Sequence, residues 1–470
     1  MDGGSIPPIS TTTRRFARRA DRRVVVALGR DCTRASRHAA HSFVPSACRS
    51  PRVQSAAELA ADSSASACIH DTERMQVQGS VAPGFESVRE AFEHGHADDP
   101  GAAQLCVYRC GERVVDLWTG RDADTGVDVD GDTPTVLWSV TKGLMSVVVA
   151  QLIERGDLDP EALVTDYWPE YGVNGKEGTR VAHLLTHTAG LPQFPADLPI
   201  APTDIADRER CADILAVSAP MWEPGTASIY HAFTFGLLVD EVVRRATGRS
   251  TASLFAERVN GPLGTDIWMA GIPADLEPGV THRHLWHNVP LDALAEWARY
   301  GVDLTDPVVQ RLADPAPSYE DWVAFLNTPL GHAIEFGSAG GIASARSLAA
   351  VYAACLSEGL NGVTLFGEAT RAAVTRPRTP ELGPLPQFAS VPREGQMHFG
   401  LGFMVGSPFV DARFRDGGTF GHPGAGGNYA FAHPASGTAV GYTCTSMWAD
   451  STRRDTRTVW ADALAEVVGA

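Results

Sequence analysis

Predicted β-strands lie near both ends of this chain, and the long stretch between them is mostly helical. β-rich runs at 104–108 and 114–118 flank Arg109-Cys110-Gly111-Glu112, a pattern typical of a hairpin. Further strand-like runs, separated by glycine and proline turns, follow at 400–405, 418–420, 428–432 and 439–444. A sheet needs helices to cover it, so this order predicts one α+β layer domain that holds an inserted helical domain.

Three helical patterns belong to the same domain. Phe85, Val88 and Phe92 have helical spacing. A long helix is predicted after Trp138, and it ends near Gly156, a residue suited to a C-terminal cap. A closing amphipathic helix is predicted at 458–468.

The composition changes near residue 75. Residues 1–74 contain 12 arginines, no lysine and 7 acidic residues without hydrophobic periodicity, which predicts a disordered extension. Thr13-Arg14-Arg15-Phe16 is similar to a twin-arginine export signal, but the apolar run that follows is too short. A translation start placed too far upstream and a processed targeting peptide both stay open. We expect the folded domain at 75–470, with an α/β part at 75–150 and 335–470 and a helical part at 151–334.

Composition excludes several classes of function. The formal net charge is −17 over 470 residues, whereas nucleic-acid binding needs clustered lysine and arginine. No apolar run approaches the roughly 18–20 residues of a membrane helix, so no membrane partner is expected. The 8 cysteines are too scattered for a disulfide scaffold. We therefore expect free thiols and a cytoplasmic location, and the sequence indicates no oligomeric state.

Ser139-Val140-Thr141-Lys142, at the start of the long helix, is the strongest candidate for chemistry. Positions i and i+3 share a helical face, so the Ser139 hydroxyl and the Lys142 amine can meet. A serine nucleophile needs a base, and burial beside the positive end of the helix dipole favours a neutral lysine. The chain has only two lysines, Lys142 and Lys176, and arginine cannot act as a base. The alternative is an ordinary helix start with a surface lysine.

A second candidate is Tyr230, which follows the turn Trp222-Glu223-Pro224-Gly225. A phenol beside an ammonium ionises more easily, so Lys142 and Tyr230 could share a proton as a coupled pair. A core aromatic is the alternative at this position.

A third candidate is the segment Phe420-Gly421-His422-Pro423-Gly424-Ala425-Gly426-Gly427. Its glycines let a substrate approach the backbone closely. An N–H just after Gly424 could form an oxyanion hole with the N–H of Ser139. A plain turn between strands is the alternative.

Together with Leu184-Leu185-Thr186-His187-Thr188-Ala189-Gly190-Leu191, these motifs resemble the serine β-lactamase and penicillin-binding-protein superfamily. The most similar branch is class C-like and includes the family VIII carboxylesterases. The resemblance covers about 75–470 and implies an antiparallel sheet flanked by helices, an α/β sandwich, with an inserted helical domain. It also places Glu335–Gly341 on the floor of an active site.

The resemblance implies a role for each candidate residue. Ser139 would be the nucleophile, Lys142 its base partner, and Tyr230 the base that activates water. His422 would stand in place of the lysine of a Lys-Thr-Gly triad, and Ala425, after Gly424, would supply the second oxyanion N–H. No metal or organic cofactor is implied.

Two departures from the class C pattern favour ester substrates. Ala232 stands where those β-lactamases have an asparagine, and His422 is a weaker cation than lysine. Both changes weaken recognition of an anionic lactam and leave ester cleavage unaffected. We expect a serine hydrolase that cleaves carboxylic esters through an acyl-enzyme on Ser139, and its partner is expected to be a small-molecule ester or amide substrate. A β-lactamase or D-Ala-D-Ala peptidase, an acyltransferase and a non-catalytic ligand-binding scaffold are the alternatives.

Thr281-His282-Arg283-His284-Leu285-Trp286-His287 has the histidine spacing of metallo-β-lactamase-fold enzymes. Those enzymes have an aspartate where this chain has Trp286, and tryptophan cannot ligate a metal. We therefore expect paired or solvated surface histidines here.

Overall fold

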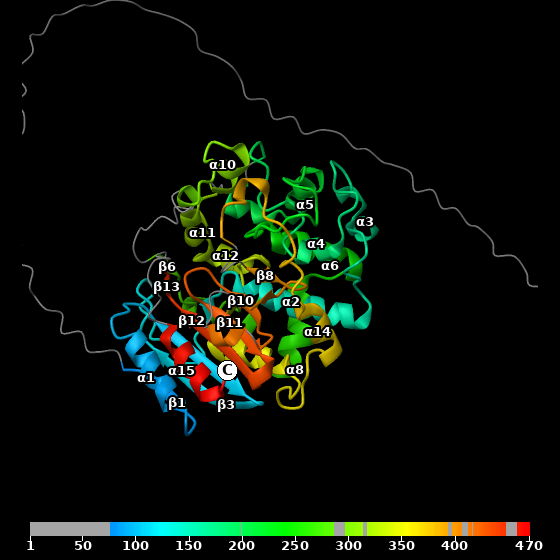
Figure 1. The fold of residues 1–470 in the computed structure, drawn as a ribbon. Helices are drawn as coiled ribbons and strands as arrows, with labels where there is room; N and C mark the ends of the chain where they lie inside the picture. Colours follow the sequence, from blue (N-terminus) through cyan, green and yellow to red (C-terminus); the bar gives the residue numbers. More distant parts are fainter. Residues whose placement is uncertain are drawn as a thin grey trace, which may run out of the picture. The chain divides into compact units, whose positions relative to one another are not determined.

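An eight-stranded antiparallel sheet is the centre of the computed structural model (Figure 1). Three strands from the start of the domain and five from its end meet side by side in it, because β2 pairs with β12 from Ala103 opposite Cys444 to Arg109 opposite Thr438. The spatial order is β1 (Gln78–Val81), β3 (Glu112–Thr119), β2 (Ala103–Arg109), β12 (Thr438–Cys444), β11 (Tyr429–His433), β10 (Phe420–Pro423), β9 (Met404–Val405) and β8 (His398–Phe399). The expected antiparallel sheet is confirmed.

The structure describes residues 76–198, 200–285, 297–313, 317–392, 397–406, 412–415, 417–447 and 458–470. The predicted disordered extension at 1–74 lies outside them. The hairpin at 109–112 is confirmed by the pairing of β2 with β3. The run predicted at 400–405 was too long, because the backbone turns at Gly402, whose φ is +90°, and only Met404–Val405 is extended.

Helices cover both faces of the sheet. Alternate residues of a strand point to opposite faces, and in β2 Leu105 and Val107 belong to one apolar cluster while Cys106 belongs to another. Helices α1 (Glu86–Gly95) and α15 (Val459–Val468) pack together on the first face (Figure 1). Helix α13 (Ala345–Ala354) covers the second face, beside α2 (Val140–Arg155).

Helix α2 is the central helix of the domain. Every residue from Val140 to Leu152 is buried, which explains why the helix is apolar on all sides rather than on one stripe. The helix ends as predicted at Gly156, whose φ of +75° is the left-handed conformation that glycine adopts at low cost.

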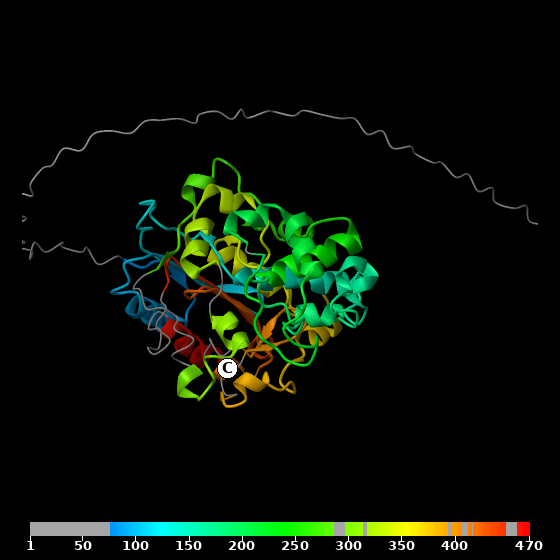
Figure 2. The same cartoon turned by 90° about the horizontal axis from the view of Figure 1, so that it is seen from above.

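The stretch between the two groups of strands is mostly helical, as predicted, and most of its helices (green) lie together to one side of the strands (Figure 2). Its longest helices are α5 (Arg208–Val217), α6 (Thr234–Thr247) and α11 (Tyr319–Leu326). Shorter helices are α3 (Val164–Tyr167), α4 (Val181–Leu185), α7 (Thr251–Phe255), α8 (Gly261–Leu263), α10 (Pro307–Ala313) and α12 (Pro329–Ala333), and α14 (Glu368–Thr375) follows α13.

Two small sheets tie this helical stretch to the rest of the domain. Strand β7 (Ile342–Ala343) lies between β4 (Thr135–Val136) and β5 (Ile267–Trp268). Strand β6 (His284–Leu285) pairs in parallel with β13 (Ser446–Met447). Within the described part of the chain, no helix is both long and apolar enough to cross a membrane.

Candidate active site

Ser139 is the residue that immediately precedes helix α2, and its side chain is half-buried. Trp138 before it is buried with a φ of +55°, a conformation that costs energy for a residue other than glycine. Thr141 fixes this bend, because its backbone N–H and its hydroxyl both donate to the Trp138 carbonyl, at 2.9 and 2.6 Å. Ser139 therefore stands directly after a bend that Thr141 holds, at the start of a helix whose first N–H groups have no partner within it.

Lys142 lies one helical turn after Ser139, and the two side chains meet as predicted. The lysine Nζ is 3.1 Å from the serine Oγ and donates to the Ser338 carbonyl at 2.7 Å. The Lys142 side chain is fully buried, and this burial lowers its pKa well below the usual lysine range. A lysine in this setting can hold its amine neutral and accept a proton from Ser139.

The loop that carries the Ser338 carbonyl is held from several directions. The Ser338 hydroxyl accepts from the Gly236 N–H at 2.8 Å and donates to the Phe233 carbonyl at 2.6 Å. A side chain at Gly337 would collide with Met145 of α2. The segment 335–341 therefore lies directly beside the lysine, as the resemblance implied.

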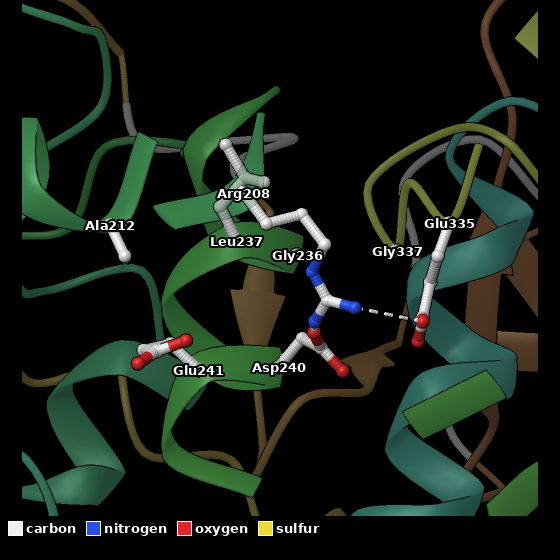
Figure 3. A pocket seen from close by; sticks show the side chains of 8 residues that line it. All are labelled: Arg208, Ala212, Gly236, Leu237, Asp240, Glu241, Glu335 and Gly337. Carbon is white, nitrogen blue, oxygen red and sulfur yellow. Dashed lines mark hydrogen bonds and ion pairs between the residues drawn. The ribbon is translucent and has the colours of Figure 1, made fainter. Parts of the chain in front are cut away.

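An ion-pair network anchors the start of this loop (Figure 3). Arg208 lies between two carboxylates, forming an ion pair with Asp240 and another, at 3.1 Å, with Glu335. Glu335 also accepts from the Ala252 N–H at 2.8 Å. These groups line a small hollow beside α6 that does not include Ser139. Because its charges are already paired, we read the hollow as support for the loop.

Tyr230 is brought to the same site. Its ring centroid is 5.0 Å from Lys142 Nζ. The segment that carries it is held by His187, whose Nδ1 accepts from the His231 N–H at 3.0 Å and whose carbonyl accepts from the Ile229 N–H at 3.2 Å. His187 has a φ of +58° and lies in the motif 184–191, so that motif positions the tyrosine from both sides.

The Tyr230 phenol is less acidic than the sequence suggested. Its hydroxyl is buried and has no hydrogen-bond partner of ordinary geometry among the described residues. Burial raises the pKa of Tyr230 above its ordinary value, and the nearby Ser139 hydroxyl lowers it by less. The expected ease of ionisation assumed a lysine ammonium, whereas burial also lowers the pKa of Lys142. In the free enzyme burial therefore favours the neutral form of both groups, the amine and the phenol.

His422 lies on β10 and completes the cluster. Its ring centroid is 5.8 Å from that of Tyr230, and its Nδ1 is 2.6 Å from the Pro423 carbonyl oxygen. Burial, with a smaller contribution from Lys142 when its amine is protonated, lowers the pKa of His422 to about 3. His422 is thus neutral at ordinary pH and cannot supply the positive charge of the lysine that it replaces.

The glycines after His422 form a turn, which was the alternative reading of this segment. Strand β10 ends at Pro423, and the Gly424 N–H donates to the Asn428 carbonyl at 2.7 Å, which closes the turn. A Cβ at Gly424 would lie 2.4 Å from the Leu137 carbonyl oxygen. The absence of a side chain therefore lets the turn that carries Ala425 approach the segment that leads into Ser139.

The histidines of the segment 281–287 that the structure describes, His282 and His284, are paired with acidic side chains. His284 Nε2 is 3.3 Å from Asp122 Oδ2, and both His284 and His282 lie within 3.6 Å of Asp124 Oδ2. Trp286 and His287 lie outside the described residues. Within the described ranges, no group of three histidine, cysteine or acidic side chains could hold a metal ion.

Sequence comparison agrees with this architecture. Residues 88–465 match the Beta-lactamase family model. The chain belongs to the Beta-lactamase family. Within the family it is 30% identical over 376 residues to the esterase/beta-lactamase LipL of Mycobacterium tuberculosis, a match that covers 77% of this chain and 82% of that protein.

Solved structures of similar proteins have the same fold. A family VIII carboxylesterase is 29% identical with a TM-score of 0.69, covering 83% of this chain and 100% of the other. EstA from Arthrobacter nitroguajacolicus Rue61a is 30% identical with a TM-score of 0.68, covering 84% and 99%. The β-lactamase-like fold expected from the motifs is confirmed.

Proposed function

We propose that this chain is a serine hydrolase that cleaves carboxylic esters through an acyl-enzyme on Ser139. The observation that carries the proposal is the 3.1 Å contact between Ser139 Oγ and the buried amine of Lys142. A nucleophile within hydrogen-bond reach of a neutral base is the arrangement that acyl transfer requires. The esterase names of two relatives that cover most of the chain support the same chemistry.

The protonation states suggest how each step is balanced. Ser139 attacks the ester carbonyl and its proton passes to Lys142, which becomes an ammonium. Tyr230 then gives its phenolic proton to the leaving alcohol, and the ammonium stabilises the phenolate that remains. In the second half the phenolate takes a proton from water, the hydroxide attacks the acyl group, and Lys142 returns its proton to Ser139.

The oxyanion would be held by backbone donors. We assign the N–H groups of Ser139 and Ala425 to this role, with Gly424 allowing the close approach of their two segments. Fixed donors aimed at developing negative charge commonly make the largest single contribution to acyl transfer.

A neutral site favours an uncharged ester over an anionic lactam. The pKa of His422 is about 3, and Ala232 offers no amide to a ligand. The β-lactamase, peptidase and acyltransferase alternatives share the same nucleophile but are less well supported. A non-catalytic scaffold would not need the contact between Ser139 and Lys142.

We further propose a cytoplasmic location, which the five free cysteines among the described residues support. The division into an α/β part (75–150 and 335–470) and a helical part (151–334) is likewise a proposal. It is supported by the main-sheet strands, which lie at 78–119 and 398–444.

Initial-rate hydrolysis of 4-nitrophenyl butyrate tests the function. Ser139→Ala should lose nearly all activity. Binding and the oxyanion hole alone should leave a rate about 10³–10⁴-fold above that of uncatalysed hydrolysis in water. The exposed Ser253 on α7, replaced by alanine, is the matched control and should retain wild-type activity. A chromogenic cephalosporin should be a poorer substrate, and equal activity of Ser139→Ala and wild type would refute the proposal.

A further inference from the structure

The turn 424–428 carries one of the two proposed oxyanion donors, and its glycine backbone does not by itself hold that donor in one conformation. Gly426 has a φ of +76° and Gly427 of +116°, conformations that glycine adopts easily and also leaves easily. Such a turn holds an N–H in place only if other groups fix it. The structure provides two buried side chains that do so.

Asn428 joins the turn to the segment that leads into Ser139. Its side chain is fully buried, and its Nδ2 donates to the carbonyls of Val136 and Leu137, at 3.1 and 3.2 Å. Its Oδ1 accepts from the Cys444 N–H at 2.9 Å. One amide therefore connects the two segments that carry the proposed oxyanion donors with the neighbouring strand β12.

Arg283 holds both this amide and the turn. Its guanidinium donates from Nη1 to Asn428 Oδ1 at 2.7 Å and from Nη2 to the Ala425 carbonyl at 2.8 Å. The residue is only 1% exposed, and a buried cation is costly unless hydrogen bonds compensate for its lost hydration. A Cβ at Gly426 would lie 2.8 Å from Nη2, so the guanidinium also fills the space beside the turn.

The backbone of Arg283 is fixed in turn by Asn327. The Arg283 N–H donates to Asn327 Oδ1 at 2.9 Å, and Asn327 Nδ2 donates back to the Arg283 carbonyl at 2.8 Å. Asn327 directly follows helix α11, so the guanidinium is presented from the helical stretch. Hydrogen bonds at both ends of the residue leave it little freedom to move.

We infer that Arg283 is a positioning residue for ester hydrolysis. Together with Asn428, it holds the turn 424–428 against the segment before Ser139, so that the N–H groups of Ala425 and Ser139 face the same oxygen. The inference rests on the proposed function. Arg283 does not touch the reacting atoms, and its effect should appear where negative charge develops on the carbonyl oxygen.

The test compares an oxygen ester with its thiono analogue, 4-nitrophenyl butyrate against 4-nitrophenyl thionobutyrate. Backbone N–H donors stabilise a developing oxyanion better than a developing thiolate, so an intact hole favours the oxygen ester. Arg283→Met should reduce kcat for the oxygen ester about 10- to 100-fold, less than the roughly 10²–10³-fold loss on deleting a donor. The ratio of oxygen to thiono rates should fall with it, and Arg283→Lys should partly restore the ratio.

The matched control is Arg371 on α14, a buried arginine that donates to Cys355 O and Ser357 Oγ. Arg371→Met should keep the wild-type rate ratio even if it lowers stability. Arg283→Gln and Asn428→Ser, which should also lower the ratio, replace Arg283→Met if that variant does not fold. A wild-type ratio in folded Arg283→Met, Arg283→Gln or Asn428→Ser overturns the inference. Absence of ester hydrolysis in the wild type would instead refute the proposed function.

Discussion

At the scale of single residues, the two lysines of the chain show what the sequence could and could not reveal. Lys176 is as buried as Lys142, and its amine donates to three backbone carbonyls, those of Val173, Ala216 and Ser218. Both of the chain's lysines are therefore buried. Only Lys142 has a serine three residues before it, and that spacing distinguishes it as the candidate base. Spacing along one helix made the Ser139–Lys142 contact predictable.

Other parts of the site could not be predicted from local spacing. The Ser338 carbonyl that holds Lys142 lies 196 residues away in the sequence. Arg283 stands between His282 and His284, and the only local pattern at this position is the histidine spacing of a metal motif. A backbone acceptor or a buried arginine has no local sequence signature, and its role appears only when distant segments pack together.

The two lysines provide a direct test of the base. Lys142→Arg replaces an amine that can accept the Ser139 proton by a permanent cation that cannot, so kcat/KM for an ester should fall about 10²–10⁴-fold. Lys176→Arg should retain the wild-type kcat, although its bulk lowers the melting temperature. If Lys142→Arg retained most of the activity, Lys142 would not be the base.

At the scale of elements, helix α2, which begins just after Ser139, packs against strand β10, which carries His422. Gly143 makes this packing possible, since a Cβ there would lie 2.3 Å from Tyr352 Oη and 3.2 Å from His422 Cβ. The hairpin β2–β3 and the bounds of α2 were predictable because each has a continuous local pattern. Strands β8 and β9 were not, because each has only two residues and is defined by its neighbours.

Gly143→Ala should therefore destabilise the protein by about 1–3 kcal/mol through overpacking, and lower kcat by shifting Ser139. The Tyr352 hydroxyl is buried without a hydrogen-bond partner among the described residues, so Tyr352→Phe alone should cost little.

Combining the two changes removes the atom with which the new methyl group collides. Urea unfolding of the single variants and the double variant measures the recovery. A double variant no more stable than Gly143→Ala would show that the close approach to Tyr352 is not what requires glycine at 143.

At the scale of the whole molecule, the family resemblance implied the antiparallel sheet, but neither it nor periodicity predicted the order of the strands. Local patterns located the β-rich runs, but the pairing of β2 with β12 joins residues more than 300 positions apart. Such pairing depends on burying apolar faces that both ends of the chain contribute. The same packing buries several histidines beside the active site.

Those histidines make stability depend on pH. Burial lowers the pKa of His187 well below its usual range, that of His231 to about 4 and that of His422 to about 3. An unfolded histidine binds a proton near pH 6.5, so below that pH the unfolded state binds protons that the folded state does not. Stability should fall as the pH drops from 7 to 5, by up to about 1.4 kcal/mol per pH unit for each histidine.

The urea concentration at the midpoint of unfolding, measured at pH 7 and at pH 5, tests this loss of stability. His422→Gln removes one titrating group and should make the pH dependence shallower. A midpoint that stays level or rises on acidification would contradict the account of buried neutral histidines.

The acyl-enzyme is the central claim, and Tyr230→Phe offers the most direct way to observe it. 4-Nitrophenolate leaves without a proton, so this variant should still acylate, whereas water activation should fail. We predict a burst of about one 4-nitrophenolate per enzyme, followed by slow turnover. Mass spectrometry of the quenched variant should find a butyryl group on the peptide that contains Ser139. Steady turnover by the wild type, with no burst in Tyr230→Phe and no adduct at Ser139, would contradict the account.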